Sequence, residues 1–371
     1  MRIAAIYWPT SSVGGINTEL RNFRAEADRR GDTFHVLRSG LHKTINPCVF
    51  KERKTIRGGD TFITIDGEAP HHPTKVEATL EFLHANYDRV YYAFLCPHPT
   101  KDYGDAPHFI PMYSDCLLPI TSRVTDGYWE SYAEWGTEAL KYCDAVTVSQ
   151  PAFASFFEHP NVTPSWFPFD MKDQPKIKRA PEPLTVWTSQ WKAIKGIHKL
   201  LPHLDRVDHD MEMYSNGILY YQLRSKDDWK RVMGDDWFAP EFSGNGKIPF
   251  FGCVPWDEIP AILARSWFMI DLMGAGKPKN AVYTQGSFNN TTVEALWYGS
   301  CPVLHSQAKA IPGLEELCLF VEEHSEVPEL INKASSKKFS RSKERIDKAR
   351  KWVKKNFDAS KVYNIAVLGE Q

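Results

Sequence analysis

Short apolar runs alternate with amphipathic stretches along most of the chain. The first run covers residues 2–8, and the stretch 16–30 after a glycine-containing loop places Leu20, Phe23 and Ala27 on one helical face. Strands that alternate with helices are typical of α/β proteins, in which helices cover both faces of a parallel sheet. We therefore predict an α/β domain that starts at the N-terminus.

The same alternation resumes after a proline-rich stretch. Strands are predicted at 184–190, 268–273 and 301–305, with helix-like segments between them. A chain of 371 residues also exceeds the size at which a single hydrophobic core stops growing. The predicted organisation is an N-terminal domain over 1–165, a linker over 166–183, a C-terminal domain over 184–345 and a C-terminal helix over 346–371.

Composition and charge exclude several protein classes. With 42% apolar and 25% charged residues, the chain is that of a globular protein. Its formal net charge of −1 gives no overall attraction to nucleic acid or membranes. No apolar run is long enough to span a bilayer and no signal peptide is evident, so we expect a soluble, cytoplasmic protein. The seven cysteines include no C-x-x-C pair, which indicates reduced thiols, with no disulfide framework or zinc site implied.

Two segments are locally basic. The segment 38–57 holds six basic residues against one acid, a net charge of +5, and follows the second predicted strand. It either tracks a phosphate backbone or forms a solvated hairpin. The segment 333–361 holds twelve basic residues against three acids, a net charge of +9. Apolar Ile346, Ala349 and Val353 there indicate a helix with one packed face and one solvated, basic face.

The stretch 284–306 carries the most specific candidate chemistry. Its polar beginning leads into a short helix that Gly299 ends, with capping candidates Asn289, Asn290, Thr291 and Thr292. A helix start directs N–H groups and the positive end of its dipole at an anion in front of it. Glu294, one turn inside, is placed to accept hydrogen bonds from a ribose diol while the helix start binds a pyrophosphate. The alternative is an ordinary amphipathic helix.

Other candidates lie at predicted strand ends, where open α/β sheets bind ligands. Gly14 and Gly15 follow the first strand, but the absence of a complete G-x-G-x-x-G motif argues against a nicotinamide dinucleotide site. Lys192 and Lys195 stand at a helix start and suit a diphosphate. Gly252 ends a further strand and permits the close backbone approach that a flat base requires.

The first domain supplies one candidate catalytic residue. His98 lies between two prolines after a buried strand, a position that suits chemistry, although a structural role is the alternative. The connection 102–136 is rich in proline, glycine and aromatic residues. Connections of this length inside a domain are usually functional, so we predict an acceptor-binding lid.

Taken together, these pieces resemble the GT-B glycosyltransferases, and within them the retaining family 4 type, over nearly the whole chain. The likeness is carried by the first glycine loop, by Lys195-Gly196, by PFFGCV at 249–254 and most specifically by VEALWYGSCPVLHS at 293–306. The last motif keeps the family's spacing of glutamate, glycine and proline. The resemblance implies two Rossmann-like domains that face a cleft, with the C-terminal helix returning to the N-terminal domain.

The resemblance also assigns roles to the residues of the second domain. It implies that Glu294 binds the nucleotide ribose, and that Thr291, Thr292 and nearby amides such as that of Asn290 hold the diphosphate. Lys195 then neutralises the leaving group. The implied donor is a UDP-sugar, with no tightly bound cofactor and no metal site.

The main chain around Cys253 and Val254 is implied to read the base, and His98 to face the donor sugar and its developing positive charge. The sequence departs from the family at two places. Gly286 stands where the family has a first glutamate, and Gln190 stands where it has an arginine. Lys192 is then needed to supply the missing charge, or the contact to the donor differs.

A narrower likeness, mostly in the second domain, is to the DNA α-glucosyltransferases of T-even bacteriophages, which also lack the first glutamate. It implies UDP-glucose as donor, a hydroxymethylated pyrimidine in duplex DNA as acceptor, and the host cytoplasm as location. The basic loop then lies along DNA phosphates through Lys43, Lys51, Arg53, Lys54 and Arg57. The rival hypotheses are a polysaccharide or lipid-linked acceptor on the same fold, and a non-catalytic sugar-nucleotide-binding protein.

Overall fold

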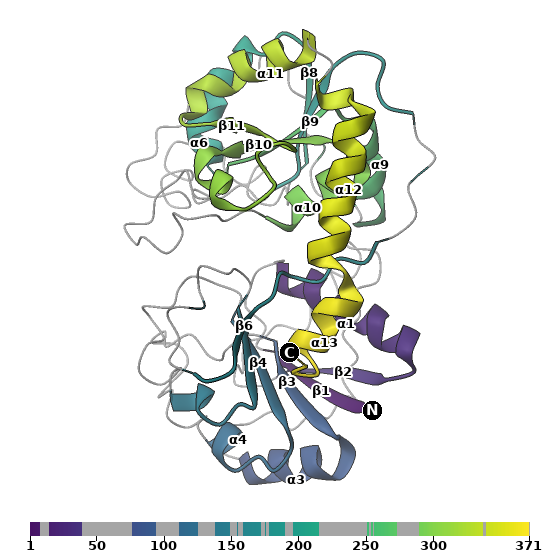
Figure 1. Ribbon diagram of the computed structural model, residues 1–371, viewed down its shortest axis with the longest axis vertical. Coiled ribbons are helices and arrows are strands. Elements are labelled where there is room, and N and C mark those ends of the chain that lie inside the picture. The colour runs from purple at the N-terminus through teal and green to yellow at the C-terminus, as the bar shows by residue number, and fades with distance from the viewer. Residues whose placement is uncertain are drawn as a thin grey trace. The chain divides into compact units, whose positions relative to one another are not determined.

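The chain forms two compact units of the α/β class in a computed structural model (Figure 1). The first unit comprises the described residues up to Met171 together with 356–370, and the second comprises those from 175 to Lys355. The structure describes residues 1–7, 15–38, 76–93, 111–124, 138–148, 154, 159–171, 175, 178–189, 196–214, 251, 254, 256–272, 289–336 and 339–370.

The first unit is built on a parallel sheet of six strands in the order β2-β1-β3-β4-β5-β6. The strands are β1 (Arg2–Tyr7), β2 (Thr33–Arg38), β3 (Arg89–Tyr92), β4 (Ile120–Val124), β5 (Ala145–Val148) and β6 (Val162–Pro164). The described helices are α1 (Gly15–Arg30), α3 (Val76–Asn86), α4 (Pro111–Ser114) and α13 (Ala359–Ala366). Strands covered by helices on both faces are largely buried, which explains the apolar runs of β1 and β5.

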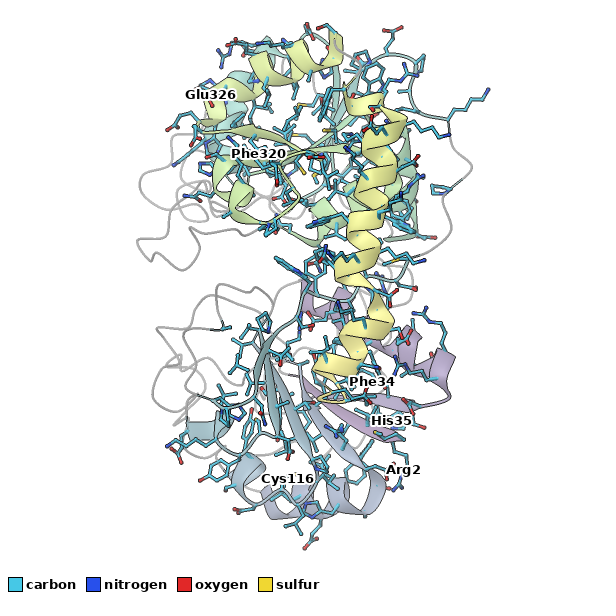
Figure 2. The ribbon with its side chains drawn as sticks, viewed as in Figure 1. Arg2, Phe34, His35, Cys116, Phe320 and Glu326 are labelled. Carbon is cyan, nitrogen blue, oxygen red and sulfur yellow. The ribbon has the colours of Figure 1, made fainter. Side chains whose placement is uncertain are left out.

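Aromatic side chains form much of the core between α1, α13 and this sheet. The Phe23 ring of α1 lies 5.5 Å from the Tyr91 ring and 6.0 Å from the Tyr363 ring, measured between centroids. Phe34 of β2, which is labelled in Figure 2, lies 6.3 Å from each of the same two rings, measured between centroids. The helical spacing of Leu20, Phe23 and Ala27 therefore marks a real buried face, because all three are at most 1% exposed.

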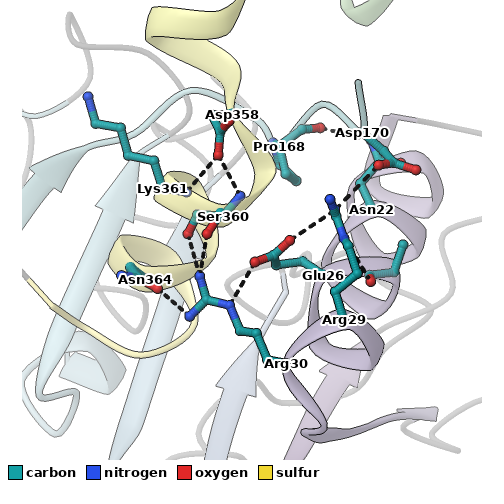
Figure 3. Close-up of polar contacts among 11 residues, drawn as sticks. Asn22, Glu26, Arg29, Arg30, Pro168, Asp170, Asp358, Ser360, Lys361 and Asn364 are labelled. Atoms are coloured by element: carbon teal, nitrogen blue, oxygen red, sulfur yellow. Dashed lines mark hydrogen bonds and ion pairs between the residues drawn. The ribbon is translucent and has the colours of Figure 1, made fainter. Parts of the chain in front are cut away.

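The C-terminal helix returns to the first unit, as the resemblance implied (Figure 3). Arg30 at the end of α1 donates to the Ser360 carbonyl at 2.9 Å and to the Ser360 hydroxyl at 2.7 Å. Its guanidinium also donates to the Asn364 side chain at 2.5 Å and to Glu26 at 2.7 Å. The Asp358 carboxylate caps α13 by accepting from the N–H groups of residues 360 and 361.

The chain after β6 also belongs to the first unit. The Phe169 N–H donates to the Phe357 carbonyl at 2.8 Å, and the Asn22 side chain donates to the Pro168 carbonyl at 2.9 Å. Arg29 forms an ion pair with Asp170 at 3.3 Å (Figure 3). These contacts join α1, the segment 167–170 and the C-terminal segment on one side of the unit.

The second unit is built on a parallel sheet of five strands in the order β11-β10-β9-β7-β8. The strands are β7 (Leu184–Trp187), β8 (Asp210–Met213), β9 (Phe268–Asp271), β10 (Cys301–His305) and β11 (Leu319–Val321). The described α-helices are α6 (Ile197–Leu200), α9 (Ile259–Arg265), α10 (Asn290–Tyr298), α11 (Val327–Ser336) and α12 (Lys343–Phe357), the last of which ends in the first unit. The 3-10 helices are η7 (Leu201–Arg206), η8 (Trp256–Glu258), η10 (Ser306–Ala310), η11 (His324–Glu326) and η12 (Phe339–Arg341).

Local sequence signals account for several element boundaries. The predicted strand 301–305 is β10, and Gly299 ends α10 in the left-handed conformation with φ of 98°. The helix-like segment 197–204, which follows the first predicted strand of the second domain, is α-helical only over its first turn, α6. Pro202 lacks an N–H and cannot continue an α-helical ladder, so the chain continues as the 3-10 helix η7.

Candidate functional site

Strand order locates the candidate site of the second unit. The chain passes from β7 to β8 on one side and later enters β9 on the other side of β7. Open α/β sheets bind ligands at the carboxyl ends of strands where the chain switches sides in this way. The carboxyl ends of β7 and β9 therefore define the candidate site.

Asp271, the last residue of β9, organises this edge and is only 2% exposed. Its Oδ2 accepts hydrogen bonds from the Asn289 backbone N–H at 2.9 Å and from the Thr292 hydroxyl at 2.7 Å. Its Oδ1 accepts another from the Asn289 side-chain amide. A carboxylate is favourable beside the positive end of a helix dipole. Asp271 thereby fixes the first turn of α10 against the sheet.

The first turn of α10 offers backbone donors at the same edge. Asn289 is the N-cap in an extended conformation, and the first N–H groups of a helix have no carbonyl partner within the helix. Thr292 is committed elsewhere, because its N–H donates to the Asn289 carbonyl at 3.0 Å and its hydroxyl donates to Asp271. Among the described residues of this turn, the donors that remain for an anion are therefore the amides of Asn290 and Thr291 and the Thr291 hydroxyl.

Glu294 lies on the buried side of α10. It is 2% exposed, and its neighbours Val293 and Ala295 are fully buried. Burying a carboxylate is costly unless hydrogen-bond donors or positive charges surround it, so a glutamate at this position requires such partners. The assignment of Glu294 to a ribose stays a prediction.

Buried hydroxyl and amide oxygens gather along the same sheet edge. Thr188 and Ser189 directly follow β7, Thr291 lies in the first turn of α10, and Gln307 follows β10. Within the described part of the chain, the Oγ1 atoms of Thr188 and Thr291, the Ser189 Oγ and the Gln307 Oε1 are buried without a hydrogen-bond partner. A buried polar atom without a partner costs about 1 to 3 kcal/mol. Such atoms suit a ligand rich in hydroxyl and phosphate groups.

A close approach of two segments forms the start of α6. Gly196 is the N-cap with φ of 75°, and a Cβ atom built there meets the Nε2 of His324 at 2.5 Å and the Cβ of Leu272 at 3.4 Å. His324 begins η11 after β11 and is 5% exposed. The glycine is therefore required both by its backbone conformation and by the space that His324 occupies.

Replacing Gly196 with alanine is expected to lower the free energy of unfolding by about 3 kcal/mol, of which about 1 reflects the left-handed backbone and about 2 the displacement of His324. Gly31→Ala is the matched control, because Gly31 has the same φ of 75° and no atom within 4 Å of the added Cβ. It is expected to cost only about 1 kcal/mol. Urea denaturation of both variants measures the difference. Equal losses in the free energy of unfolding would show that His324 accommodates the added methyl group without cost.

Arginines hold the opposite end of α10. Arg345, 3% exposed, donates to the Gly299 carbonyl at 2.8 Å, the Ser340 carbonyl at 3.0 Å and the Leu317 carbonyl at 3.1 Å. Arg179 also donates to the Gly299 and Ser340 carbonyls, and burial next to other arginines lowers its pKa to about 10. Carbonyls at a helix C-terminus carry partial negative charge, so cations stabilise this end.

A buried charge pair lies near the carboxyl end of the sheet in the first unit. Arg123 of β4 is fully buried, and its Nε lies 2.5 Å from the Glu19 carboxylate of α1. The Tyr91 hydroxyl donates to the same carboxylate at 3.1 Å. Burial raises the pKa of the Glu19 carboxyl, and Arg123 opposes that rise. The pair ties the beginning of α1, which follows the predicted glycine loop, to β3 and β4.

Comparisons with known proteins bear on the fold. No protein-family model and no curated protein matches the sequence. Anabaena HepE in complex with UDP-glucose matches with a TM-score of 0.65 at 13% identity, over 100% of this chain and 99% of that one. An α-glucosyltransferase in complex with UDP and a 13-mer DNA containing an HMU base matches with a TM-score of 0.66 at 13% identity, over 98% and 97% of the two chains. The same kind of enzyme with UDP-glucose and DNA containing an abasic site matches with a TM-score of 0.64 at 14% identity, over 98% of each chain.

The chain has the GT-B fold. The prediction of two Rossmann-like domains is thus confirmed. In this GT-B chain the structure describes five of the predicted donor-site residues, namely Val254, Asn290, Thr291, Thr292 and Glu294. Four of the five belong to α10, so one short helix carries most of the predicted donor-site residues that the structure describes.

Most other predicted site residues lie outside the described residues of the GT-B fold. In the first unit they are His98, Gly14 and the basic residues Lys43, Lys51, Arg53, Lys54 and Arg57. In the second unit they are Gln190, Lys192, Lys195, Gly252 and Cys253. Gly15 is described as the first residue of α1, and its role in a ligand-binding loop stays a prediction.

Sequence reasoning missed several residues that build this edge of the GT-B fold. Asp271 could have been predicted from the sequence, because a lone carboxylate that ends a buried apolar strand falls at the carboxyl edge of the sheet. No sequence pattern places His324 and Gln307 at this edge, since their positions depend on how β10 and β11 pair with β9. Among the described residues, no His, Cys, Asp and Glu side chains group in a way that could hold a metal ion. None of the described helices combines the length and apolarity of a membrane span.

Proposed function

We propose that the protein is a retaining glycosyltransferase that moves a sugar from a UDP-sugar to a hydroxymethylated pyrimidine in DNA. The observation that carries the donor half is the edge formed by β7, β9 and α10, where buried oxygens without described partners surround a helix start. Solved structures of the same fold contain UDP or UDP-glucose, which supports a UDP-sugar as donor. Support for DNA as acceptor comes from the α-glucosyltransferase complexes with DNA.

In the donor half of the site, different residues of the second unit bind the diphosphate, the ribose and the base of the nucleotide. The amides of Asn290 and Thr291 and the Thr291 hydroxyl bind the diphosphate, because the Thr292 donors are engaged within the protein. Glu294 accepts hydrogen bonds from the ribose hydroxyls. Lys192 and Lys195 neutralise the diphosphate as it leaves, Gln190 contributes to the same donor site, and the main chain from Gly252 to Val254 reads the base.

Catalysis is mainly electrostatic. The bond between the anomeric carbon and the diphosphate oxygen breaks, and the acceptor hydroxyl oxygen bonds to the same carbon on the same face, so the anomeric configuration is retained. The hydroxyl proton leaves with the departing diphosphate. The largest contribution from the protein is the stabilisation of the charge that develops on that diphosphate. His98 remains the predicted contact to the sugar.

An assay of transfer tests this proposal directly. The full-length protein is incubated with UDP-glucose and duplex DNA that contains either 5-hydroxymethylcytosine or unmodified cytosine, and the nucleosides are analysed by mass spectrometry. The expected result is a hexose adduct on the hydroxymethylated nucleoside alone, with the α-configuration seen by NMR. Transfer to a glycan or lipid acceptor with no adduct on either DNA would replace the DNA acceptor, and no transfer to any acceptor would favour a binding protein.

Glu294→Ala is expected to weaken UDP binding by about 1 to 3 kcal/mol, the value of charge-assisted hydrogen bonds to the ribose. This corresponds to a roughly 5- to 150-fold rise in the dissociation constant for UDP, measured by isothermal titration calorimetry. Glu258→Ala is the matched control, since Glu258 is an exposed carboxylate before α9 in the same unit. Unchanged UDP affinity in the Glu294 variant would remove this residue from the site.

A further inference from the structure

Three exposed lysines lie together on α12, which is drawn in yellow in Figure 1. Lys351, Lys354 and Lys355 are here named the lysine stripe, and each is exposed. At about 100° per residue, positions three and four apart fall on one side of a helix. Among the described residues, no acidic side chain forms an ion pair with any of the three, whereas the nearby Lys348 pairs with Glu316 and Glu344 at 3.1 and 3.2 Å.

The opposite side of α12 fixes this orientation. Ala349 and Val353 are fully buried. Arg345 donates to the Gly299 carbonyl, and Arg350 donates to the Trp297 carbonyl at 3.1 Å, so two long side chains are anchored on α10. Because α12 cannot rotate without breaking these contacts, the stripe is held facing away from the core of the second unit.

The charge of the stripe is not neutralised along the helix. The whole of α12 holds seven basic residues and two acidic ones, Glu344 and Asp347, neither of which forms an ion pair with the stripe, although the whole chain has a net charge of −1. Like charges three and four apart on a helix are unfavourable by a few tenths of a kcal/mol per pair. An arrangement of this kind is stabilised by a partner with closely spaced negative charges.

We propose that the lysine stripe binds the phosphate backbone of duplex DNA, an inference that rests on the proposed function. Duplex DNA carries one negative charge per about 1.7 Å of its axis, and the stripe covers about 6 Å of helix, so several phosphates face the three lysines at once. A membrane surface fits less well, because basic helices that lie on membranes bury apolar side chains beside their lysines. The apolar residues of α12 are already committed, with Val353 and Phe357 fully buried and the Trp352 indole donating to the Pro312 carbonyl at 2.9 Å.

Salt-dependent binding of the full-length protein to a short, unmodified, fluorescein-labelled duplex tests the proposal. In the variant Lys351→Gln/Lys354→Gln/Lys355→Gln, the slope of log K against log salt concentration is expected to fall by about three, and affinity at about 0.1 M salt by tenfold or more. The control Lys141→Gln/Lys178→Gln/Lys333→Gln removes the same charge from exposed lysines elsewhere and is expected to bind nearly as the unmodified protein does. UDP affinity is expected to be equal in all three proteins.

Two results would overturn the inference. One is a stripe variant that binds DNA as well as the control variant does. The other is loss of binding to vesicles containing phosphatidylserine with DNA binding unchanged, which would assign the stripe to a membrane. Both leave the proposed transferase activity intact, since transfer to hydroxymethylated DNA is measured separately. Binding of DNA that depends on the stripe, without any transfer, would instead overturn the proposed function alone.

Discussion

Replacing Asp271 with alanine is expected to lower the free energy of unfolding by about 3 to 5 kcal/mol. The carboxylate accepts three hydrogen bonds from Asn289 and Thr292, and a hydrogen bond to a charged group contributes about 1.5 to 3 kcal/mol. Its removal leaves the buried Thr292 hydroxyl without its acceptor. Urea denaturation measures the loss, and hydrogen exchange in β9 and β10 locates it in the second unit.

The same substitution bears on the proposed donor site. The first turn of α10 loses its attachment to β9, so UDP affinity is expected to fall by about tenfold or more. A tenfold fall corresponds to about 1.4 kcal/mol of binding free energy. Asp271→Asn keeps the shape and one acceptor oxygen and is expected to lose less than half as much stability. Asp257→Ala serves as a surface control, because Asp257 is exposed. A loss below about 1 kcal/mol for Asp271→Ala would show that the first turn is held by other contacts.

Replacing Tyr363 with alanine is expected to destabilise the first unit by about 3 to 5 kcal/mol, the usual cost of removing a large buried ring. Tyr363 is fully buried and lies in ring contact with Phe23 and Phe34. The Arg30 guanidinium lies 4.8 Å from the centre of the Tyr363 ring, and the Tyr363 hydroxyl donates to Asp32 at 3.2 Å. Faster hydrogen exchange in β1 and β2, more than 300 residues away in the sequence, is the expected signature.

Tyr363→Phe separates the ring from its hydroxyl. This variant keeps the packing and loses only the hydrogen bond to Asp32, so about 1 kcal/mol is expected. If Tyr363→Ala left the exchange of β1 and β2 unchanged, the C-terminal helix would not be part of the core of the first unit. The comparison therefore tests whether residues 356–370 are integral to this unit.

Local patterns were sufficient for much of the fold. The apolar run 2–8 and the amphipathic stretch 16–30 correspond to β1 and α1 within one residue at each end. Gly299 ended its helix as predicted, because only a glycine enters the left-handed conformation there at little cost. These features depend on neighbours in the sequence, which is why the sequence alone was enough.

The position of α10 also followed from local signals, but its attachment did not. Asn289 is the N-cap, yet its side chain bonds Asp271 in place of capping its own helix. Thr292, predicted as a phosphate ligand, donates its hydroxyl to the same carboxylate. Asp271 lies 18 residues before Asn289, and no local pattern pairs the two.

By itself, the sequence determined many of the segments that form strands and helices, because periodicity and capping act over a few residues. The prediction of 102–136 as an irregular lid was wrong over part of its length, because this stretch holds α4 and the buried sheet strand β4, whose largely polar sequence ITSRV hides its strand character. Only the tertiary structure decided which side chains meet: Asp271 with Asn289, Gly196 with His324, and Tyr363 with Phe23. The physical reason is that strand order brings together residues far apart in the chain, and that order depends on the packing of whole sheets and helices.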